Sequence, residues 1–172
     1  MTDLYVTWDD YMDHTERLAI KVHDHGYKFN QIVCIAKGGL RVGDIIQRIF
    51  DVPLAIMSVE SYHGDGVKNQ QGNIVFGNSL AKTTPNLGNK VLLVDDLSDT
   101  GLTLNKSIDW LKEYDPIKNY INEIKTACLW KKKSSSFTPD FCPILLENDP
   151  WIVQPSEYYD EVDIEALKKK HS

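Results

Sequence analysis

The chain has 172 residues, of which 42% are hydrophobic and 26% charged, so its length and composition suit one ordinary globular domain and exclude a mostly disordered protein. Its longest apolar run is five residues (32–36), against the about 20 that a membrane-spanning helix needs, and the N-terminus lacks the basic and apolar regions of a secretory signal. The net charge of −6 disfavours general binding to nucleic acid or to an anionic membrane. The cysteines are odd in number and lie at unrelated spacings, so we expect reduced, buried thiols in a cytoplasmic protein (Cys34, Cys128 and Cys142).

The first predicted element is a helix near residues 8–25. Thr7 suits its N-cap position, and Asp10 lies three residues further on, where a carboxylate can reach back to the backbone. Gly26 suits the end of the helix. Apolar residues fall on one face at a spacing of about 3.6 residues, which predicts that this face is buried. They are Trp8, Met12, Leu18, Ala19 and Val22.

Short apolar runs without alternation predict strands that are buried on both faces of a parallel sheet. These runs are at 32–36, 55–59, 91–94 and 124–130. Apolar residues at helical spacing follow the first and third runs. Strands that alternate with helices imply right-handed βαβ units, so we expect an α/β fold, a single domain over 1–172 with a parallel twisted sheet flanked by helices.

The pattern weakens between about Ser61 and Asn89, a span that holds five glycines. We interpret this span as a long, mobile excursion with a hairpin around Asn73–Phe76. Long segments of this kind inside a compact domain are usually functional or disordered.

The most informative segment, residues 91–103, begins in a predicted buried strand. Open α/β sheets bind ligands at the carboxyl ends of their strands. Asp95 and Asp96 come directly after the strand, and charges placed there need a metal ion, a sugar hydroxyl or a basic partner. The following Asp-Thr-Gly-Leu-Thr (99–103) opens a predicted helix, whose free N–H groups and two threonine hydroxyls suit one phosphate. The combination indicates a ribose phosphate, with a magnesium ion at the carboxylates.

This segment resembles the 5-phosphoribosyl 1-pyrophosphate (PRPP) motif of the type I phosphoribosyltransferases, in which an apolar run and two acids precede Asp-Thr-Gly-x-Thr. The resemblance implies the fold of that family, with a small hood and a mobile lid loop. It also implies that Asp95 and Asp96 bind the ribose hydroxyls, directly or through Mg²⁺, and that Asp99 acts as a general base near N7 of a purine. The 5′-phosphate would be held by the backbone and hydroxyls of Asp99, Thr100, Gly101, Leu102 and Thr103.

A second match follows the first predicted strand, at Ala36, Lys37, Gly38 and Gly39. In the family this position is the pyrophosphate loop. Pyrophosphate needs backbone N–H donors, a cation, and glycines that let the chain approach closely. The resemblance further implies a non-proline cis peptide between Ala36 and Lys37. Arg41 is a further candidate for a phosphate contact or a subunit contact.

Near the C-terminus, Trp-Ile-Val-Gln-Pro (151–155) resembles the base-binding segment of bacterial xanthine-guanine phosphoribosyltransferases, which reads Trp-Ile-Glu-Gln-Pro. The resemblance implies that Trp151 stacks on a purine and that Ile152 offers its carbonyl to the 2-position edge. Val153 stands where those enzymes have an acid, so a xanthine preference does not follow. Glu157 is a candidate for binding metal or for orienting the base edge.

The family also uses a lysine that donates to the 6-oxo group of the purine. Lys131, Lys132 and Lys133 follow the last predicted strand, and the spacing to Trp151 favours Lys132, with one residue either way left open. A lysine at that place selects guanine, hypoxanthine or xanthine over adenine, which presents a donor there.

Ser61 and Tyr62 resemble a pair in the lid of the purine members of the family. Such a lid covers PRPP during the reaction and keeps water away from the ribosyl transition state. The resemblance also divides the domain into a core of about 26–130 and a hood from about 1–10 and 131–172.

The resemblance therefore implies a Mg²⁺-dependent purine phosphoribosyltransferase of the salvage pathway. It would convert guanine, xanthine or hypoxanthine and PRPP to the nucleoside 5′-monophosphate and pyrophosphate. We expect a cytoplasmic homodimer or homotetramer without a nucleic-acid or membrane partner. Two alternatives stay open: a phosphoribosyltransferase for another base, such as orotate, uracil or adenine, and a non-catalytic PRPP-binding regulator of the same fold.

Overall fold

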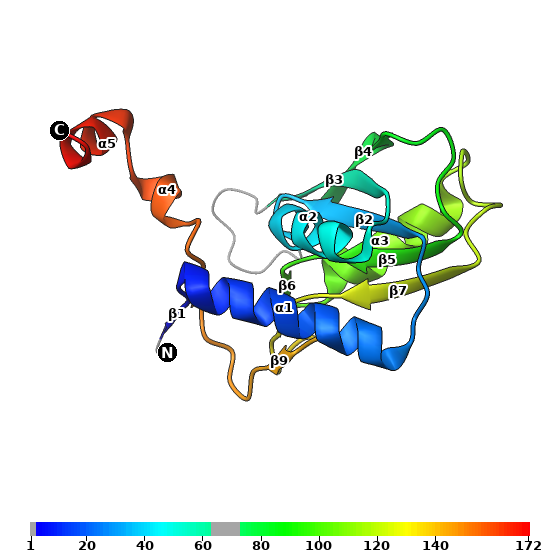
Figure 1. The fold of residues 1–172 in the computed structure, drawn as a ribbon, viewed down its shortest axis with the longest axis horizontal. Helices are drawn as coiled ribbons and strands as arrows, with labels where there is room; N and C mark the ends of the chain where they lie inside the picture. The colour runs from blue at the N-terminus through cyan, green and yellow to red at the C-terminus, as the bar shows by residue number, and fades with distance from the viewer. Residues whose placement is uncertain (1–2, 63–72) are drawn as a thin grey trace.

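The computed structural model describes residues 3–62 and 73–172 (Figure 1). Its main sheet has five strands in the order β4-β3-β2-β5-β7, and every neighbouring pair is parallel except β3–β4. The predicted α/β fold is therefore confirmed. The elements are β1 Leu4–Tyr5, α1 Trp8–His25, β2 Gln31–Ala36, α2 Gly39–Phe50, β3 Leu54–Tyr62, β4 Asn73–Lys82, β5 Lys90–Val94, β6 Leu97–Ser98, α3 Leu102–Glu113, β7 Glu123–Ala127, β8 Trp130–Lys131, β9 Ile144–Leu145, β10 Ile152–Val153, α4 Tyr158–Glu161 and α5 Ile164–Lys170.

Alternate side chains of the central strands enter two separate cores, one on each face of the main sheet. In β2, Ile32 and Cys34 join the core that contains residues of α1 and α2, whereas Val33 and Ile35 join the core that contains residues of α3. Successive side chains point to opposite faces, so a strand that is apolar throughout is buried on both. Figure 1 shows α1 and α2 in front of the sheet and α3 behind it.

Helix α1 begins and ends where the sequence predicts. The Thr7 hydroxyl oxygen accepts from the Asp10 N–H at 3.1 Å, and the Asp10 carboxylate accepts from the Thr7 N–H at 3.0 Å, which completes a capping box. Gly26 ends the helix in the left-handed conformation, with a φ of 76°.

The predicted buried face of α1 is wrong in its first turns. Trp8 and Met12 are 45% and 40% exposed, and Tyr11 is buried in their place. A helix face that includes residue 11 and one that includes residue 12 both have helical spacing, so tertiary packing decides which of the two faces is buried. The Tyr11 ring packs edge-on against the buried ring of Trp130, with centroids 5.9 Å apart. The buried residues of α1 are Tyr11, Thr15, Leu18, Ala19 and Val22.

The expectation of one long excursion over 61–89 is also wrong. Strand β3 continues to Tyr62, and residues 73–82 form the ten-residue strand β4, which runs antiparallel to β3. Strand β4 lies at the edge of the sheet, and its exposed side chains break up the apolar run that would have indicated a strand. Residues 73–76, where a hairpin was expected, form the start of β4 and pair with residues 59–62 of β3, whereas residues 63–72 lie outside the described residues.

The predicted strand at 124–130 divides between two sheets. Strand β7 ends at Ala127, after which the N–H groups of Leu129 and Trp130 both donate to the Asp96 carbonyl, at 2.9 and 3.2 Å. Trp130 and Lys131 then form β8, in a small parallel sheet of order β6-β8-β9. This turn brings the lysines after β8 next to the acidic residues after β5.

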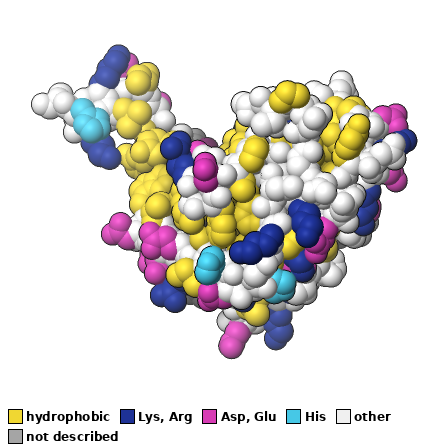
Figure 2. Space-filling model, turned by 45° about the vertical axis from the view of Figure 1, so that its right-hand side comes forward, with side chains coloured by type: hydrophobic (Ala, Val, Ile, Leu, Met, Phe, Trp, Pro, Cys, Tyr) yellow, Lys and Arg dark blue, Asp and Glu magenta, His cyan; other side chains and the backbone are white. Residues whose placement is uncertain are grey.

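The two ends of the chain meet in a short parallel pair, β1 with β10. Beyond it, α4 and α5 contain no buried residues and project from the body (Figure 1). Figure 2 shows hydrophobic side chains gathered at the base of this projection and on the body beside it. All three cysteines are free and buried, as predicted. No helix in the described ranges is long and apolar enough to cross a membrane.

Candidate active site

The predicted ribose-binding carboxylates lie at the carboxyl end of β5, next to the carboxyl end of β2. Crossovers from β2 and from β5 run to opposite sides of the sheet, so this edge is a topological switch point, where open α/β sheets bind ligands. Asp95 is 7% exposed, and its N–H donates to the Ala127 carbonyl at 3.0 Å. Asp96 is half-buried, and its N–H donates to the Asp95 carboxylate at 3.0 Å.

Burial raises the pKa of Asp95 well above its usual value, and the charge of Asp96 raises that pKa further. Two adjacent carboxylates in such a place favour a cation, and carboxylate oxygens are the donors that Mg²⁺ prefers. Asp95 and Asp96 therefore fit a magnesium ion that also carries substrate oxygens.

The predicted pyrophosphate loop lies against this acidic turn and needs both of its glycines. A Cβ on Gly38 would come within 2.4 Å of the Asp96 carboxylate, and a Cβ on Gly39 within 2.2 Å of the Val94 carbonyl oxygen. The peptide bond between Ala36 and Lys37 is cis, as predicted. The Lys37 side chain is exposed beside these backbone groups.

A small cavity of about 50 Å³ lies at the start of α3. The helix begins at Leu102 rather than at Asp99, because Gly101 adopts a φ of 84° and forms its N-cap. The residues before it form a turn in which the Thr100 hydroxyl accepts from the Leu102 N–H at 3.2 Å. The cavity has room for a group of a few heavy atoms at the positive end of the helix dipole, as a phosphate requires. Its lining residues are Leu97, Ser98, Asp99, Thr100, Gly101, Thr103 and Leu104.

The structure separates the three consecutive lysines by what each side chain reaches. The Lys132 Nζ lies 3.0 Å from the Asp99 carboxylate, and Lys132 is 8% exposed. The Lys131 Nζ donates to the carbonyls of Lys132 and Ser135, and Lys133 is exposed. Of the three, Lys132 is the one that meets the acidic segment.

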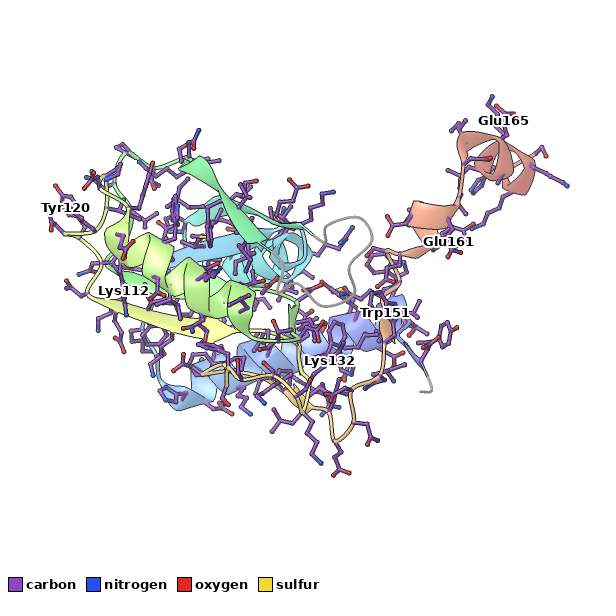
Figure 3. The ribbon with its side chains drawn as sticks, turned by 180° about the vertical axis from the view of Figure 1, so that it is seen from behind. Lys112, Tyr120, Lys132, Trp151, Glu161 and Glu165 are labelled. Carbon is purple, nitrogen blue, oxygen red and sulfur yellow. The ribbon has the colours of Figure 1, made fainter. Side chains whose placement is uncertain are left out.

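Lys132 also lies beside the predicted base-stacking residue. Its Nζ is 5.9 Å from the ring centroid of Trp151, which is 62% exposed (Figure 3). The N–H groups of Leu4 and Val6 donate to the carbonyls of Trp151 and Val153, at 2.8 and 3.0 Å. Carbonyls alternate along a strand, so the Ile152 carbonyl faces the edge of β10 opposite to β1.

Glu157 does not approach the acidic pair directly. Its carboxylate accepts from the Gln154 N–H at 3.0 Å, and Gln154 in turn donates to Asp96. Within 3–62 and 73–172, no group of three or more His, Cys, Asp and Glu side chains is arranged to hold a metal ion. A magnesium ion here would therefore depend on the acidic pair and on oxygens of the substrate.

The remaining predicted residues lie around these groups. Ser61 and Tyr62 end β3, and the lid that was expected to follow them lies outside the described residues. Arg41 is exposed in the first turn of α2, and its charge opposes the rise in the pKa of Tyr11. Burial and the charge of Asp96 cause that rise, so Arg41 and Asp96 each lie within electrostatic range of the Tyr11 hydroxyl.

The sequence does not predict the contact of Gln154 with Asp96, nor the burial of Tyr11 within electrostatic range of Asp96. Gln154 belongs to the quoted segment 151–155, but only its neighbours were expected to act. Tyr11 lies one turn after Trp8, outside the face of α1 that the apolar spacing predicts to be buried.

Taken together, one edge of the sheet carries a phosphate-sized cradle, an acidic pair, a glycine loop with a lysine, and a lysine beside an exposed aromatic ring. That set suits a phosphorylated sugar with a second anionic group and a planar base. The chain belongs to the phosphoribosyl transferase domain family, whose model matches residues 4–162. The resemblance to the type I phosphoribosyltransferases is thereby confirmed.

Three similar proteins illustrate the relationship. The crystal structure of a purine phosphoribosyltransferase from Pyrococcus horikoshii OT3 has a TM-score of 0.68 and 30% identity, with 90% of this chain and 94% of that chain covered. The hypoxanthine-guanine phosphoribosyltransferase of Mus spretus is 30% identical over 147 residues, which cover 76% of this chain and 64% of that protein. Phosphoribosyltransferase domain-containing protein 1 of Xenopus laevis is 27% identical over 152 residues, which cover 80% of this chain. The chain thus spans 64% of the length of these two curated relatives.

Proposed function

We propose that this protein transfers the phosphoribosyl group of PRPP to a 6-oxopurine in purine salvage, releasing the nucleoside 5′-monophosphate and pyrophosphate. The observation that carries the proposal is the position of Lys132, whose Nζ lies 3.0 Å from Asp99 and 5.9 Å from the Trp151 ring centroid. A donor, an acceptor and a stacking face thereby converge beside the acidic turn. From the reduced cysteines we expect the enzyme to act in the cytoplasm, and from the resemblance we expect a homodimer or homotetramer.

The PRPP groups would divide among the loops at the edge of the sheet. The turn and helix start at 99–103 would hold the 5′-phosphate through N–H groups and hydroxyls. Asp95 and Asp96 would hold the ribose hydroxyls, and Lys37 with the backbone of Gly38 and Gly39 would hold the pyrophosphate. Magnesium bound there supplies charge neutralisation for the departing pyrophosphate.

The base would stack on Trp151 with its 6-oxo group toward Lys132 and its 2-position edge toward the Ile152 carbonyl. In the free protein the Lys132 ammonium pairs with Asp99, so a bound 6-oxo oxygen would take one of its three donors. Asp99 would then accept the N7 proton as N9 attacks C1 of the ribose. Because an ammonium has no acceptor, the amino group of adenine would leave a buried donor unpaired.

Steady-state kinetics with guanine, hypoxanthine, xanthine and adenine test this assignment. We expect pyrophosphate release with 6-oxopurines and at least about tenfold lower kcat/KM with adenine. Lys132→Met should lower kcat/KM for the preferred 6-oxopurine by about tenfold to hundredfold, because a charged hydrogen bond is lost.

Lys133→Met is the matched control, since the Lys133 side chain is exposed. It should leave the kinetics close to those of the unsubstituted protein. Preference for adenine, orotate or uracil would overturn the base assignment. PRPP binding without pyrophosphate release on any base would indicate a regulator instead of an enzyme.

A further inference from the structure

Asp96 is held by a side chain from the far end of the chain. The Gln154 side-chain amide donates to the Asp96 carboxylate at 2.5 Å, across 58 positions of sequence. Gln154 directly follows β10 and lies three residues after Trp151. This one hydrogen bond therefore joins the segment proposed to bind the base to the carboxylate proposed to bind the ribose.

Both ends of this hydrogen bond are fixed by their surroundings. The Asp96 carbonyl accepts from the N–H groups of Leu129 and Trp130, and the Asp96 carboxylate packs so closely on Gly38 that no Cβ fits between them. On the other side, the Gln154 N–H donates to the Glu157 carboxylate at 3.0 Å. The Gln154 backbone is thus bonded to Glu157 while its side-chain amide donates to Asp96.

The chemistry of the pair allows it to persist when a substrate binds. A neutral amide that donates to a carboxylate makes a short, charge-assisted bond. It occupies part of one carboxylate oxygen and leaves acceptor capacity for a sugar hydroxyl or a hydrated cation. A lysine in place of Gln154 would neutralise the negative charge of Asp96 that the ribose site needs, whereas the neutral amide leaves that charge in place.

We propose that Gln154 is a positioning residue that fastens the base-binding segment to the ribose carboxylate, so that Trp151 is held at the place where N9 of the base meets C1 of the ribose. This inference rests on the proposed function of both segments. Gln154 itself touches neither reacting atom; it acts through Asp96 on one side and through β10 on the other.

The kinetic test is Gln154→Met, which keeps the length of the side chain and removes its N–H groups. The KM for the base should rise about tenfold, the loss expected for one hydrogen bond to a charged group. The kcat should stay within about twofold, and calorimetry without base should give a PRPP–Mg²⁺ affinity within about threefold of the unsubstituted value. Gln47→Met in α2, far from the edge of the sheet that carries the site, is the control and should change none of these.

A second readout needs no substrate. Backbone amide hydrogen exchange over residues 151–157 should be faster in Gln154→Met than in the unsubstituted protein. The swapped pair, Asp96→Asn with Gln154→Glu, reverses donor and acceptor and should restore the slow exchange, whereas Gln154→Glu alone places two carboxylates together and should not.

An unchanged KM for the base in Gln154→Met, or equal losses of base and PRPP affinity, would overturn the proposal that Gln154 positions the base-binding segment. Exchange over 151–157 that is the same in all variants would overturn the fastening itself. If the unsubstituted protein bound no PRPP, the proposed function would fail, and the exchange measurement would still decide whether Gln154 fastens this segment.

Discussion

Asp95 shows how a single residue can favour binding at the expense of stability. Burial and the charge of Asp96 raise its pKa in the folded protein, whereas the unfolded chain has a value near 3.8. The folded state therefore binds more protons than the unfolded state between these two values, and stability falls as the pH rises through that window. Ionised Asp95 destabilises the free protein, and a bound cation would offset that effect.

Asp95→Asn should therefore stabilise the free protein at neutral pH, by on the order of 1 kcal/mol in the free energy of unfolding. The amide oxygen can still accept the Asp96 N–H, so the local bond survives. Urea unfolding at a series of pH values without Mg²⁺ checks this, and the gain should grow as the pH rises above 3.8. A variant that is less stable at every pH would contradict the account.

The choice among the three lysines shows what local sequence leaves open. The spacing to Trp151 favours Lys132, but Lys131 and Lys133 have the same chemistry and a neighbouring place in the chain. The pairing of Trp130 and Lys131 with β6 decides which side chain faces Asp99. That pairing is a tertiary contact between distant segments, which no local pattern records.

At the scale of elements, the close approach of α2 to β5 depends on Gly39. A Cβ there would meet the Val94 carbonyl oxygen at 2.2 Å, and a backbone oxygen inside a sheet cannot move aside cheaply. Gly39→Ala should lower the free energy of unfolding by about 1–3 kcal/mol and weaken pyrophosphate binding.

Thermal unfolding and pyrophosphate titration measure both effects. Gly77→Ala in β4 is the comparison, because its Cβ would meet the Ser58 side chain at 3.1 Å and would need only a small adjustment. Equal stability of the two variants would show that the approach of α2 to β5 is not tight.

Elements with local signals are the ones that the sequence predicts well. Helix α1 has a capping box and a left-handed glycine, and β2 and β5 are apolar on both faces, so their bounds follow from local chemistry. Strand β4 lies at the edge of the sheet with exposed side chains, so its sequence lacks the apolar run that predicts a strand. The end of β7 depends on a tertiary contact, because the N–H groups of Leu129 and Trp130 donate to the Asp96 carbonyl and the chain leaves the main sheet there.

At the scale of the whole molecule, the candidate site is assembled from segments at both ends and in the middle of the chain. Parallel pairing of β2 with β5 aligns the glycine loop with the acidic turn, and pairing of β1 with β10 brings the base segment over them. Motif chemistry identified these segments from sequence, because each binds a group of the substrate through its own residue types. Their connection through Gln154 and Asp96 could only be found in three dimensions.

The most direct test of the account is a calorimetric titration of PRPP with Mg²⁺ into the unsubstituted protein and into the double variant Asp95→Asn, Asp96→Asn. We predict saturable binding at one site per chain, weakened at least about tenfold in the variant, because the ribose hydroxyls and the cation lose both carboxylates. Equal affinity in the two proteins, or no binding to the unsubstituted protein, would contradict the claim that this edge of the sheet binds an activated ribose phosphate.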